Sequence, residues 1–246
     1  MKIAIAGGTG VVGRHTVEAV RNGGHEAVVL SRSQGVDLIS GKGLAAALTG
    51  VDAVIDTANV STMKADDAIE FFTTATANLI SAAADAGVGH IVLLSIVGID
   101  RMPYDYYVGK VAQEKVLEKS AVPWTIQRAT QFHEFAGQIF ERAKIGPLHI
   151  APRARTQPIA AHDVGEHLAA LATGDPQGRA QDIAGPREEA LDAMIKAFAR
   201  KSGHRGWIPS VNLPTAQMKG MRAGFALPGA GALLAGPPFE EWLAAR

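Results

Sequence analysis

The chain has 246 residues, a length that suits one α/β domain or one domain with a small appendage. Hydrophobic residues make up 47% and charged residues 20%, which is the balance of a globular chain with a sizeable core. Lys plus Arg and Asp plus Glu both number 24, and aromatic residues make up only 6%, so the composition argues against a nucleic-acid partner.

Cysteine is absent, which excludes disulfides, thiolate nucleophiles and thiolate metal sites. The apolar run at residues 3–6 is too short for the core of a signal peptide. The apolar segment 223–239 is interrupted by Gly and Pro, so it does not predict a membrane span. We therefore expect a cytoplasmic protein with no membrane partner.

Strand and helix patterns alternate through the first half of the chain. Apolar runs predict buried parallel strands at residues 2–6, 25–30, 52–56, 90–96 and 124–128. Helical spacing predicts helices at residues 11–21, 41–49, 67–86 and 106–120, and another that ends near residue 143. This alternation predicts an α/β fold with a doubly wound parallel sheet, the Rossmann type.

The alternation loosens after Gly146, where prolines become frequent. Asp163 and Glu166 predict a capping box at the start of a helix. His133 and Glu134 predict the surface start of another helix, and contact with the substrate is the alternative. A strand is expected at 181–184 and a helix at 188–201. We expect a dinucleotide-binding core over residues 1–146 and a smaller C-terminal lobe over residues 147–246 that closes the substrate pocket, together forming one structural unit.

The strongest motif lies between the first predicted strand and the first predicted helix. Gly8, Gly10 and Gly13 satisfy G-x-G-x-x-G, the spacing that lets a pyrophosphate approach backbone N–H groups at a helix N-terminus. A Walker loop is excluded because Arg14 and His15 replace its Lys and Ser/Thr. A tight structural turn without a ligand is the alternative. The predicted binding loop consists of Gly7, Gly8, Thr9, Gly10, Val11, Val12 and Gly13.

The end of the second predicted strand favours NADP(H) over NAD(H). An acidic residue about 20 residues after the glycines would bind the ribose of NAD, but Ser31, Arg32 and Ser33 stand there, and no acid follows before Asp37. The Arg32 guanidinium can pair with a 2′-phosphate and the two serines can add hydrogen bonds. The alternative is that Arg32 is an ordinary solvated side chain.

With these motifs in place, the chain resembles the atypical short-chain dehydrogenase/reductase superfamily, close to its NmrA-like, NAD(P)H-binding branch. The resemblance covers most of the chain and implies a Rossmann core, a bound nicotinamide dinucleotide and a variable C-terminal substrate region. Members of the family include reductases, epimerases and redox-sensing regulators. The resemblance rests on Gly7–Gly13, Leu94-Ser95, Tyr106–Lys110, Trp124–Phe132 and Gln157–Val164.

Tyr106 and Lys110 form the pattern Y-x-x-x-K, which places both side chains on one face of a helix. A nearby ammonium lowers the pKa of a phenol, so Tyr106 could exchange a proton with a carbonyl oxygen during hydride transfer. Lys110 could also hold the nicotinamide ribose. The family's Ser/Tyr/Lys arrangement maps onto Ser95, Tyr106 and Lys110. Tyr107 is an alternative phenol, but no lysine follows it four residues later.

Two further segments are expected to border the cofactor because they follow strands three and five. Thr57, Ala58 and Asn59 should lie near the adenine-side ribose and the pyrophosphate. Ala129, Thr130, Gln131 and Phe132 should lie near the nicotinamide, with Thr130 or Gln131 bonded to the carboxamide. Phe132 could equally be plain pocket wall.

The sequence therefore predicts an NADP(H)-dependent oxidoreductase that transfers a hydride between the nicotinamide and a small carbonyl or quinone-type substrate. The alternatives are a redox-sensing NADP(H)-binding regulator and an NAD(P)-dependent sugar epimerase. A homodimer is possible through the long helices. No metal is expected, because His162 and His167 are five residues apart and do not share a helix face.

Overall fold

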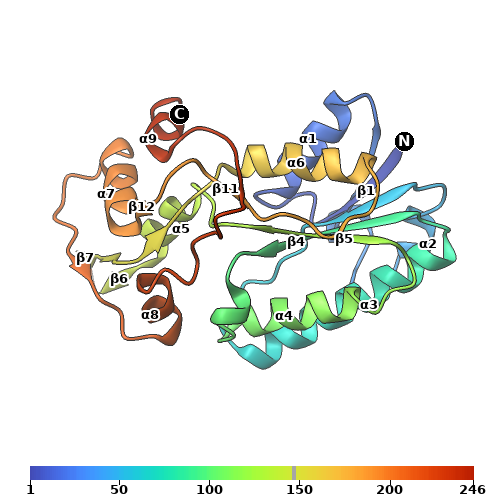
Figure 1. Ribbon diagram of the computed structural model, residues 1–246, viewed down its shortest axis with the longest axis horizontal. Coiled ribbons are helices and arrows are strands. Elements are labelled where there is room, and N and C mark those ends of the chain that lie inside the picture. Colours follow the sequence, from blue (N-terminus) through green and yellow to red (C-terminus); the bar gives the residue numbers. More distant parts are fainter. Residues whose placement is uncertain (146–147) are drawn as a thin grey trace.

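The computed structural model describes residues 1–145 and 148–246, and its centre is a parallel β-sheet (Figure 1). The strand order across this sheet is β14-β11-β5-β4-β3-β1-β2, and β10 pairs with β5. Every strand pair in it is parallel. The strands are β1 (Lys2–Ala6), β2 (Glu26–Leu30), β3 (Ala53–Asp56), β4 (His90–Ile96), β5 (Trp124–Ala129), β10 (Gly178–Arg179), β11 (Ile183–Ala184) and β14 (Leu233–Leu234).

Helices cover both faces of the sheet, which explains why its strands are apolar on both sides. In β1, Ile3 and Ile5 pack against α1 (Gly13–Asn22) and α6 (Ala161–Thr173). Ala4 and Ala6 face the opposite layer, which is formed by α2 (Leu44–Ala47), α3 (Ala65–Asp85) and α4 (Tyr106–Leu117). The doubly wound Rossmann-type fold predicted from the sequence is thus confirmed.

The first five strands begin and end within one residue of their expected positions. The helix expected at 41–49 is shorter, because Gly43 has a φ of +78° and α2 begins only after it. The capping box expected at Asp163 and Glu166 is wrong. The capping position of α6 is Ala160, three residues earlier than Asp163, and the Glu134 carboxylate accepts the Ala161 N–H at 3.3 Å.

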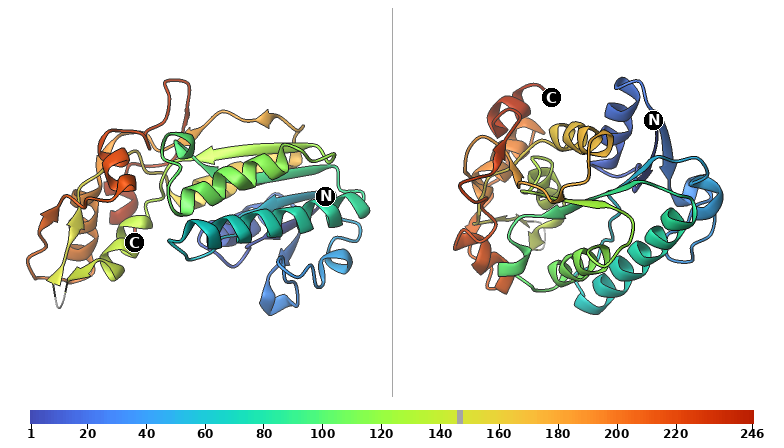
Figure 2. Two further views of the ribbon diagram at one scale, coloured as in Figure 1. Left: turned by 90° about the horizontal axis from the view of Figure 1, so that it is seen from below. Right: turned by 45° about the vertical axis from the view of Figure 1, so that its right-hand side comes forward.

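A second apolar cluster forms the smaller lobe, by which we mean α5 (Phe135–Arg142), α7 (Leu191–Lys201), α8 (Ala216–Arg222), α9 (Phe239–Ala244) and the short strands between them (Figure 2). Its core includes Leu191, Ile195 and Met221, all fully buried. Three strand pairs complete it: β6 (Lys144–Ile145) with β7 (Leu148–His149), β8 (Ala151–Pro152) with β13 (Ser210–Val211), and β9 (Arg155–Thr156) with β12 (Glu189–Ala190).

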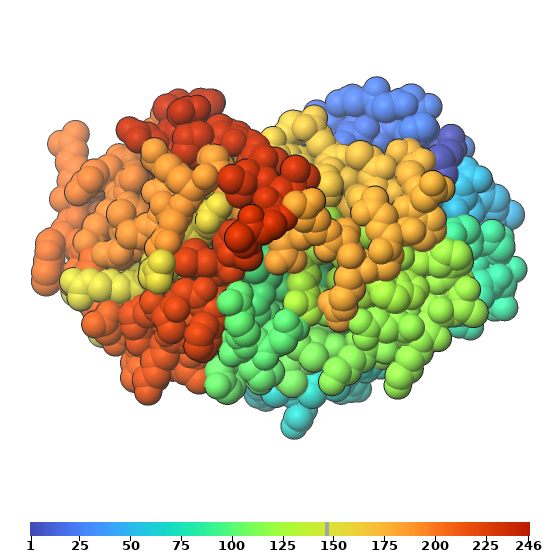
Figure 3. Space-filling model, viewed as in Figure 1, coloured from blue at the N-terminus to red at the C-terminus, as the bar shows by residue number. Residues whose placement is uncertain are grey.

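The expected division between residues 146 and 147 falls outside the described residues. This boundary in the sequence does not coincide with the boundary between the two parts of the structure. Helix α5 precedes residue 146, yet it packs against α7 in the smaller lobe. Conversely, α6, β10, β11 and β14 follow it and join the Rossmann layer. The chain therefore passes between the two parts more than once, and Figure 3 shows its last segment crossing the front of the molecule between them.

His133 also differs from its expectation as the surface start of a helix. Its ring is completely buried and packs against Phe239 and Trp242 of α9, with centroid distances of 5.5 and 5.1 Å. Its Nε2 lies 3.0 Å from the Pro237 carbonyl oxygen. The sequence pattern near residue 133 could not reveal this burial, because the covering residues come from the other end of the chain.

Candidate functional site

The carboxyl ends of the central strands form the candidate site. Strand β1 lies between β2 and β3, because the chain passes from β1 to β2 on one side and then crosses to β3 on the other side of β1. In open α/β sheets such a switch point creates a crevice where ligands bind. The loop with the glycine pattern follows β1 and leads directly into α1 at this edge.

The glycine loop is built for close backbone contacts. Gly7 has a φ of +72°, and a Cβ there would lie 2.7 Å from the Thr57 carbonyl oxygen. A Cβ at Gly13 would collide with the Gly7 carbonyl oxygen, so Gly13 is required for packing of α1 against the loop. A Cβ at Gly10 would meet only the Gly7 oxygen, at 3.1 Å. This contact is tight but leaves more room than the collisions at Gly7 and Gly13, and the sequence predicts that a pyrophosphate approaches the backbone here.

Ser31, Arg32 and Ser33 lie next to this loop, where β2 ends. The Gly7 N–H donates to the Leu30 carbonyl oxygen at 3.3 Å, which ties the two segments together. The Ser31 and Ser33 hydroxyls are 2.9 Å apart, and Arg32 is exposed at the start of a short 3₁₀ helix (Arg32–Gln34). In the described part of the chain, no carboxylate forms an ion pair with Arg32, so its guanidinium can meet a ligand phosphate.

The segment after β3 faces the predicted catalytic tyrosine. Thr57 is fixed to β1, because its hydroxyl donates to the Ala6 carbonyl oxygen at 2.8 Å. Asn59 is exposed, and its Oδ1 accepts the Tyr106 hydroxyl at 2.7 Å. Ala58, between them, donates its N–H to the Asp56 carboxylate at 2.9 Å. The structure thus brings Asn59 and Tyr106 together, a pairing the sequence pattern did not indicate.

Tyr106 and Lys110 share one face of α4, but the expected lowering of the tyrosine pKa is wrong. Burial raises the pKa of Tyr106, and the neighbouring Tyr107 and Asp56 raise it further. Burial also lowers the pKa of Lys110 to about 8, although Asp56 and Glu114 oppose this effect. The phenol therefore keeps its proton at neutral pH and is not a base there, and its raised pKa also makes it a weaker acid than an exposed tyrosine.

The Lys110 ammonium is held inside the protein. It donates to the Leu94 carbonyl oxygen at 2.8 Å and to the Gln113 side-chain oxygen, and it lies 4.7 Å from the centre of the Phe72 ring. Gln113 in turn donates to the Asp56 carboxylate at 3.0 Å. An ammonium group has three N–H donors, so these two hydrogen bonds leave one donor of Lys110 for the nicotinamide ribose that the sequence predicts.

Ser95 has a different neighbour from the one expected. Its side chain is 1% exposed, and its hydroxyl donates to the Glu114 carboxylate. That carboxylate also accepts two hydrogen bonds from the Arg128 guanidinium, at 2.9 and 2.7 Å. Within residues 1–145 and 148–246, no hydrogen bond links Ser95 to Tyr106 or Lys110. Ser95 would anchor a substrate carbonyl only by giving up its bond to Glu114.

In the segment after β5, residues 129–132, some hydrogen-bonding groups already have partners within the protein and one does not. Ala129 pairs with β11, and Phe132 forms a bridge with Ile159. The Thr130 hydroxyl donates to the Gln157 carbonyl oxygen at 2.6 Å, so it is not available to donate to a carboxamide. The Gln131 side-chain nitrogen is buried and has no partner among the described residues. Of these four residues, Gln131 is the one with a hydrogen-bond donor to offer.

Comparison with known families agrees with this arrangement. A family model described as NAD(P)H-binding matches residues 7–175. The chain belongs to this NAD(P)H-binding family. The resemblance to the atypical short-chain dehydrogenase/reductase superfamily is confirmed at the level of NAD(P)-binding Rossmann proteins. No curated protein sequence matches the chain.

Solved structures of this NAD(P)H-binding type share the fold. The Escherichia coli NADPH-dependent quinone oxidoreductase QOR2, in complex with NADPH, has a TM-score of 0.74 at 18% identity, covering 99% of both chains. MoeE5 in complex with UDP-glucuronic acid and NAD has a TM-score of 0.73 at 17% identity, covering 100% of this chain and 97% of that one. UDP-N-acetylglucosamine 4-epimerase from Bacillus cereus has a TM-score of 0.66 at 22% identity, covering 86% and 85%.

Two other features of this NAD(P)H-binding chain lie outside the candidate site. His162, Asp163 and Glu166 bring potential metal-ligand atoms within 4.8 Å of one another, while His167 points to Gln127 instead. His162 and Asp163 lie in the first turn of α6 and Glu166 in the second, near the positive end of the helix dipole, which disfavours a cation. We therefore interpret the three as ordinary surface contacts. Of the helices in the described ranges, none is long and apolar enough to cross a membrane.

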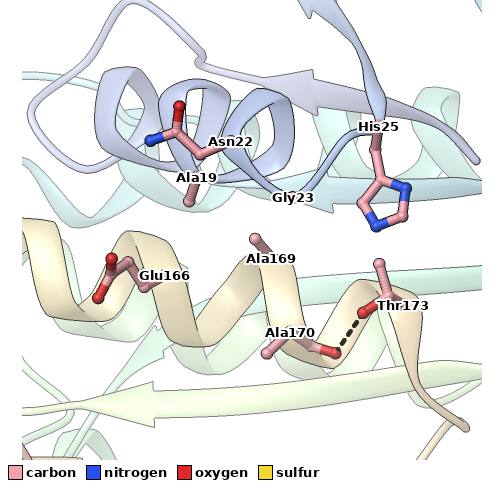
Figure 4. Close-up of a pocket in the computed structure, with 8 residues that line it drawn as sticks. All are labelled: Ala19, Asn22, Gly23, His25, Glu166, Ala169, Ala170 and Thr173. Carbon is pink, nitrogen blue, oxygen red and sulfur yellow. Dashed lines mark hydrogen bonds between the residues drawn. The ribbon is translucent and has the colours of Figure 1, made fainter.

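The second feature is a hollow of about 310 Å³ between α1 and α6, shown in Figure 4. It lies where both helices end, so it opens at the edge of the sheet opposite the glycine loop. Ala170 and Thr173 on its wall are joined by a hydrogen bond of 3.0 Å. The hollow therefore belongs neither to the candidate cofactor site nor to Tyr106. It is lined by Ala19, Asn22, Gly23, His25, Glu166, Ala169, Ala170 and Thr173.

Proposed function

We propose that the protein is an NADP(H)-dependent oxidoreductase that reduces a small carbonyl or quinone-type acceptor. The supporting observation is the Tyr106 hydroxyl, which is held by Asn59 at the carboxyl edge of the sheet and kept protonated. When bound, NADPH supplies the hydride. Tyr106 then turns its proton from the Asn59 Oδ1 to the acceptor oxygen, transfers it, and recovers a proton from water. Asn59 positions the phenol, and we assign the acceptor oxygen to Tyr106 alone.

The preference for NADP(H) rests on Arg32, Ser31 and Ser33. A charge-assisted hydrogen bond contributes about 1.5–3 kcal/mol, which corresponds to roughly 10- to 100-fold in affinity. Because Arg32 is exposed, water and salt weaken its attraction to a phosphate, and we expect the lower end of this range. The glycine loop supplies the pyrophosphate contacts that both dinucleotides share.

A calorimetric titration with NADPH, and separately with NADH, tests the cofactor. We expect NADPH to bind about 10-fold more tightly, and Arg32→Ala to remove the difference without changing the affinity for NADH. Arg21→Ala, at another exposed arginine, is the matched control. Equal affinity for both dinucleotides in the wild-type protein would refute the preference. Binding of neither would leave the glycine loop as a structural turn.

A turnover assay tests the reaction. NADPH oxidation is followed at about 340 nm with 1,4-naphthoquinone or benzaldehyde as the acceptor. Tyr106→Phe should lower kcat by about 100-fold or more, because a positioned proton donor contributes roughly 10²–10⁴-fold. Tyr104→Phe, at an exposed tyrosine just before α4, is the control. Unchanged turnover in Tyr106→Phe would remove the tyrosine from the mechanism.

A binding protein that senses the NADP(H) redox state is the second candidate. It is favoured by the internal bonds of Lys110 and Ser95, which leave fewer polar groups free for chemistry than the pattern suggests. It predicts binding of NADPH without turnover, and an affinity for a partner that differs between NADP⁺ and NADPH. Turnover that is lost in Tyr106→Phe would exclude it.

A further inference from the structure

Gln131 carries a buried hydrogen-bond donor that the protein itself does not use. Its side chain lies at the carboxyl edge of the sheet and the residue is only 8% exposed. The side-chain oxygen accepts the Thr156 hydroxyl at 2.8 Å, while the nitrogen has no partner in residues 1–145 and 148–246. Leaving a buried N–H unpaired is unfavourable, and such groups in native proteins often mark a place where a ligand binds.

The bond to Thr156 also fixes the direction of the amide. Thr156 belongs to β9 of the smaller lobe and is fully buried. The Gln131 side chain is therefore held toward the smaller lobe rather than toward the glycine loop. The amide therefore lies where the Rossmann layer meets the smaller lobe, and ligand pockets commonly form between two parts of a structure.

Tyr107 provides a second polar group near this amide. Burial raises its pKa, and the amides of Gln217 and Gln131 act in the opposite sense, which places both amides close to the phenol. No hydrogen bond of acceptable geometry joins Tyr107 to Gln131 among the described residues. The three side chains come from α4, from the segment after β5 and from α8, so they meet where the Rossmann layer adjoins the smaller lobe (Figure 1).

The surroundings of this polar group are apolar and adaptable. Met102, Met218 and Met221 are buried in the same cluster as Tyr107, and Tyr106 packs against it. The close packing of Met102 on α8 is fixed by Gly220, where a Cβ would lie 2.6 Å from the methionine sulfur. Methionine side chains adjust readily to flat rings. Apolar and adaptable surroundings of this kind suit a ring compound that carries a polar atom for the amide of Gln131.

We infer that the Gln131 side-chain nitrogen and the Tyr107 hydroxyl bind a second oxygen of the acceptor, whose first oxygen is placed at Tyr106. This inference rests on the proposed function and narrows its substrate class to quinones, which carry two carbonyl oxygens across a ring. NADPH supplies a hydride, which is two electrons and one proton, and Tyr106 supplies the second proton. The quinone becomes a hydroquinone, NADPH becomes NADP⁺, and the tyrosine regains its proton from water.

Gln131→Met tests the inference, with 1,4-naphthoquinone and benzaldehyde as acceptors. Methionine keeps the length of the side chain and removes the donor. We expect KM for naphthoquinone to rise about 10-fold, because one buried hydrogen bond is lost. The KM for benzaldehyde, which has a single oxygen, should stay close to wild type. The Kd for NADPH should stay so too, because the inference assigns the Gln131 amide to the acceptor in place of the carboxamide predicted from the sequence. Gln138→Met, at a half-buried glutamine of α5, is the matched control.

Three results would overturn the inference. An equal rise of KM for both acceptors would assign Gln131 a structural role. Weaker NADPH binding in Gln131→Met would assign its amide to the cofactor. An unchanged KM for naphthoquinone would leave the donor without a function. Thermal unfolding of each variant, followed by circular dichroism, shows whether a loss of activity reflects a loss of folding.

A failure of the proposed function is distinguished by a binding measurement that needs no turnover. If the wild-type protein oxidises NADPH with neither acceptor, naphthoquinone binding is measured by calorimetry in the presence of NADP⁺. Binding that is lost in Gln131→Met but kept in Gln138→Met would support the site while refuting the oxidoreductase. Absence of naphthoquinone binding to the wild-type protein would overturn the site as well.

Discussion

The burial of the Lys110 ammonium should make the free energy of unfolding vary with pH in the alkaline range. Burial lowers the pKa of Lys110 from 10.5, the ordinary value of a lysine, to about 8. The unfolded chain keeps this proton up to about pH 10.5, whereas the folded protein releases it near pH 8. Between these values the unfolded state binds more protons, so the free energy of unfolding rises with pH.

The size of the effect follows from the same pKa values. One pKa unit corresponds to about 1.4 kcal/mol, so a fall from 10.5 to about 8 corresponds to about 3 kcal/mol. Lys110 is 4% exposed, so water screens this effect little. We therefore expect the wild-type protein to gain about 3 kcal/mol of stability relative to Lys110→Met between pH 8 and pH 10.5.

Urea denaturation at several pH values from 7 to 10 measures this difference. Lys115→Met, at an exposed lysine of the same helix, is the control and should run parallel to the wild type. In Asp56→Asn the rise should begin below pH 8, because the Asp56 carboxylate holds the pKa of Lys110 up. Parallel curves for wild type and Lys110→Met would refute the reasoning, since they would mean that Lys110 titrates alike in both states.

Three further predictions concern packing and charge. Gly13→Ala should abolish NADPH binding in calorimetry and lower Tm, because the added Cβ collides with the Gly7 carbonyl oxygen. Glu114→Gln should cost about 3 kcal/mol in urea denaturation at pH 7, because it leaves the partly buried Arg128 facing a neutral amide. Although burial raises the pKa of Glu114, Arg128 holds it low, so this contribution should disappear as the pH falls below about 4.5. Asp105→Gly should raise stability by about 1 kcal/mol in the same assay, because Asp105 has a φ of +49°.

The Rossmann part of the fold could be predicted because the local sequence patterns of its strands and helices match the way these elements pack. Strands buried on both faces are apolar throughout, and each glycine that ends a strand or helix marks a boundary. The smaller lobe lacked such signals, since its strands are only two residues long and pair with segments far away in sequence. The burial of His133 under Phe239 and Trp242 depends on such a distant contact.

The candidate site likewise contains some features that the sequence predicts and others that only the packing determines. The glycine loop and Arg32 directly follow β1 and β2, so their places could be predicted once these two strands were located in the sequence. The partners of Ser95 and Lys110 depend on which groups fill the space between α4 and the sheet. Glu114 and Gln113 occupy that space, and both stand on the same helix as Lys110. The helical spacing of Glu114 and Gln113 was visible in the sequence, but their burial was not.

The Tyr106–Lys110 pattern shows why residue types at a given spacing do not determine their chemistry. The spacing places both side chains on one face, yet burial raises the pKa of the phenol and lowers the pKa of the ammonium. Desolvation opposes the charged form of each group, so a buried tyrosine and a buried lysine both favour their neutral forms. A neutral phenol can donate a proton but cannot accept one. The acid–base role of Tyr106 in the proposed reaction therefore depends on its burial as well as on the motif.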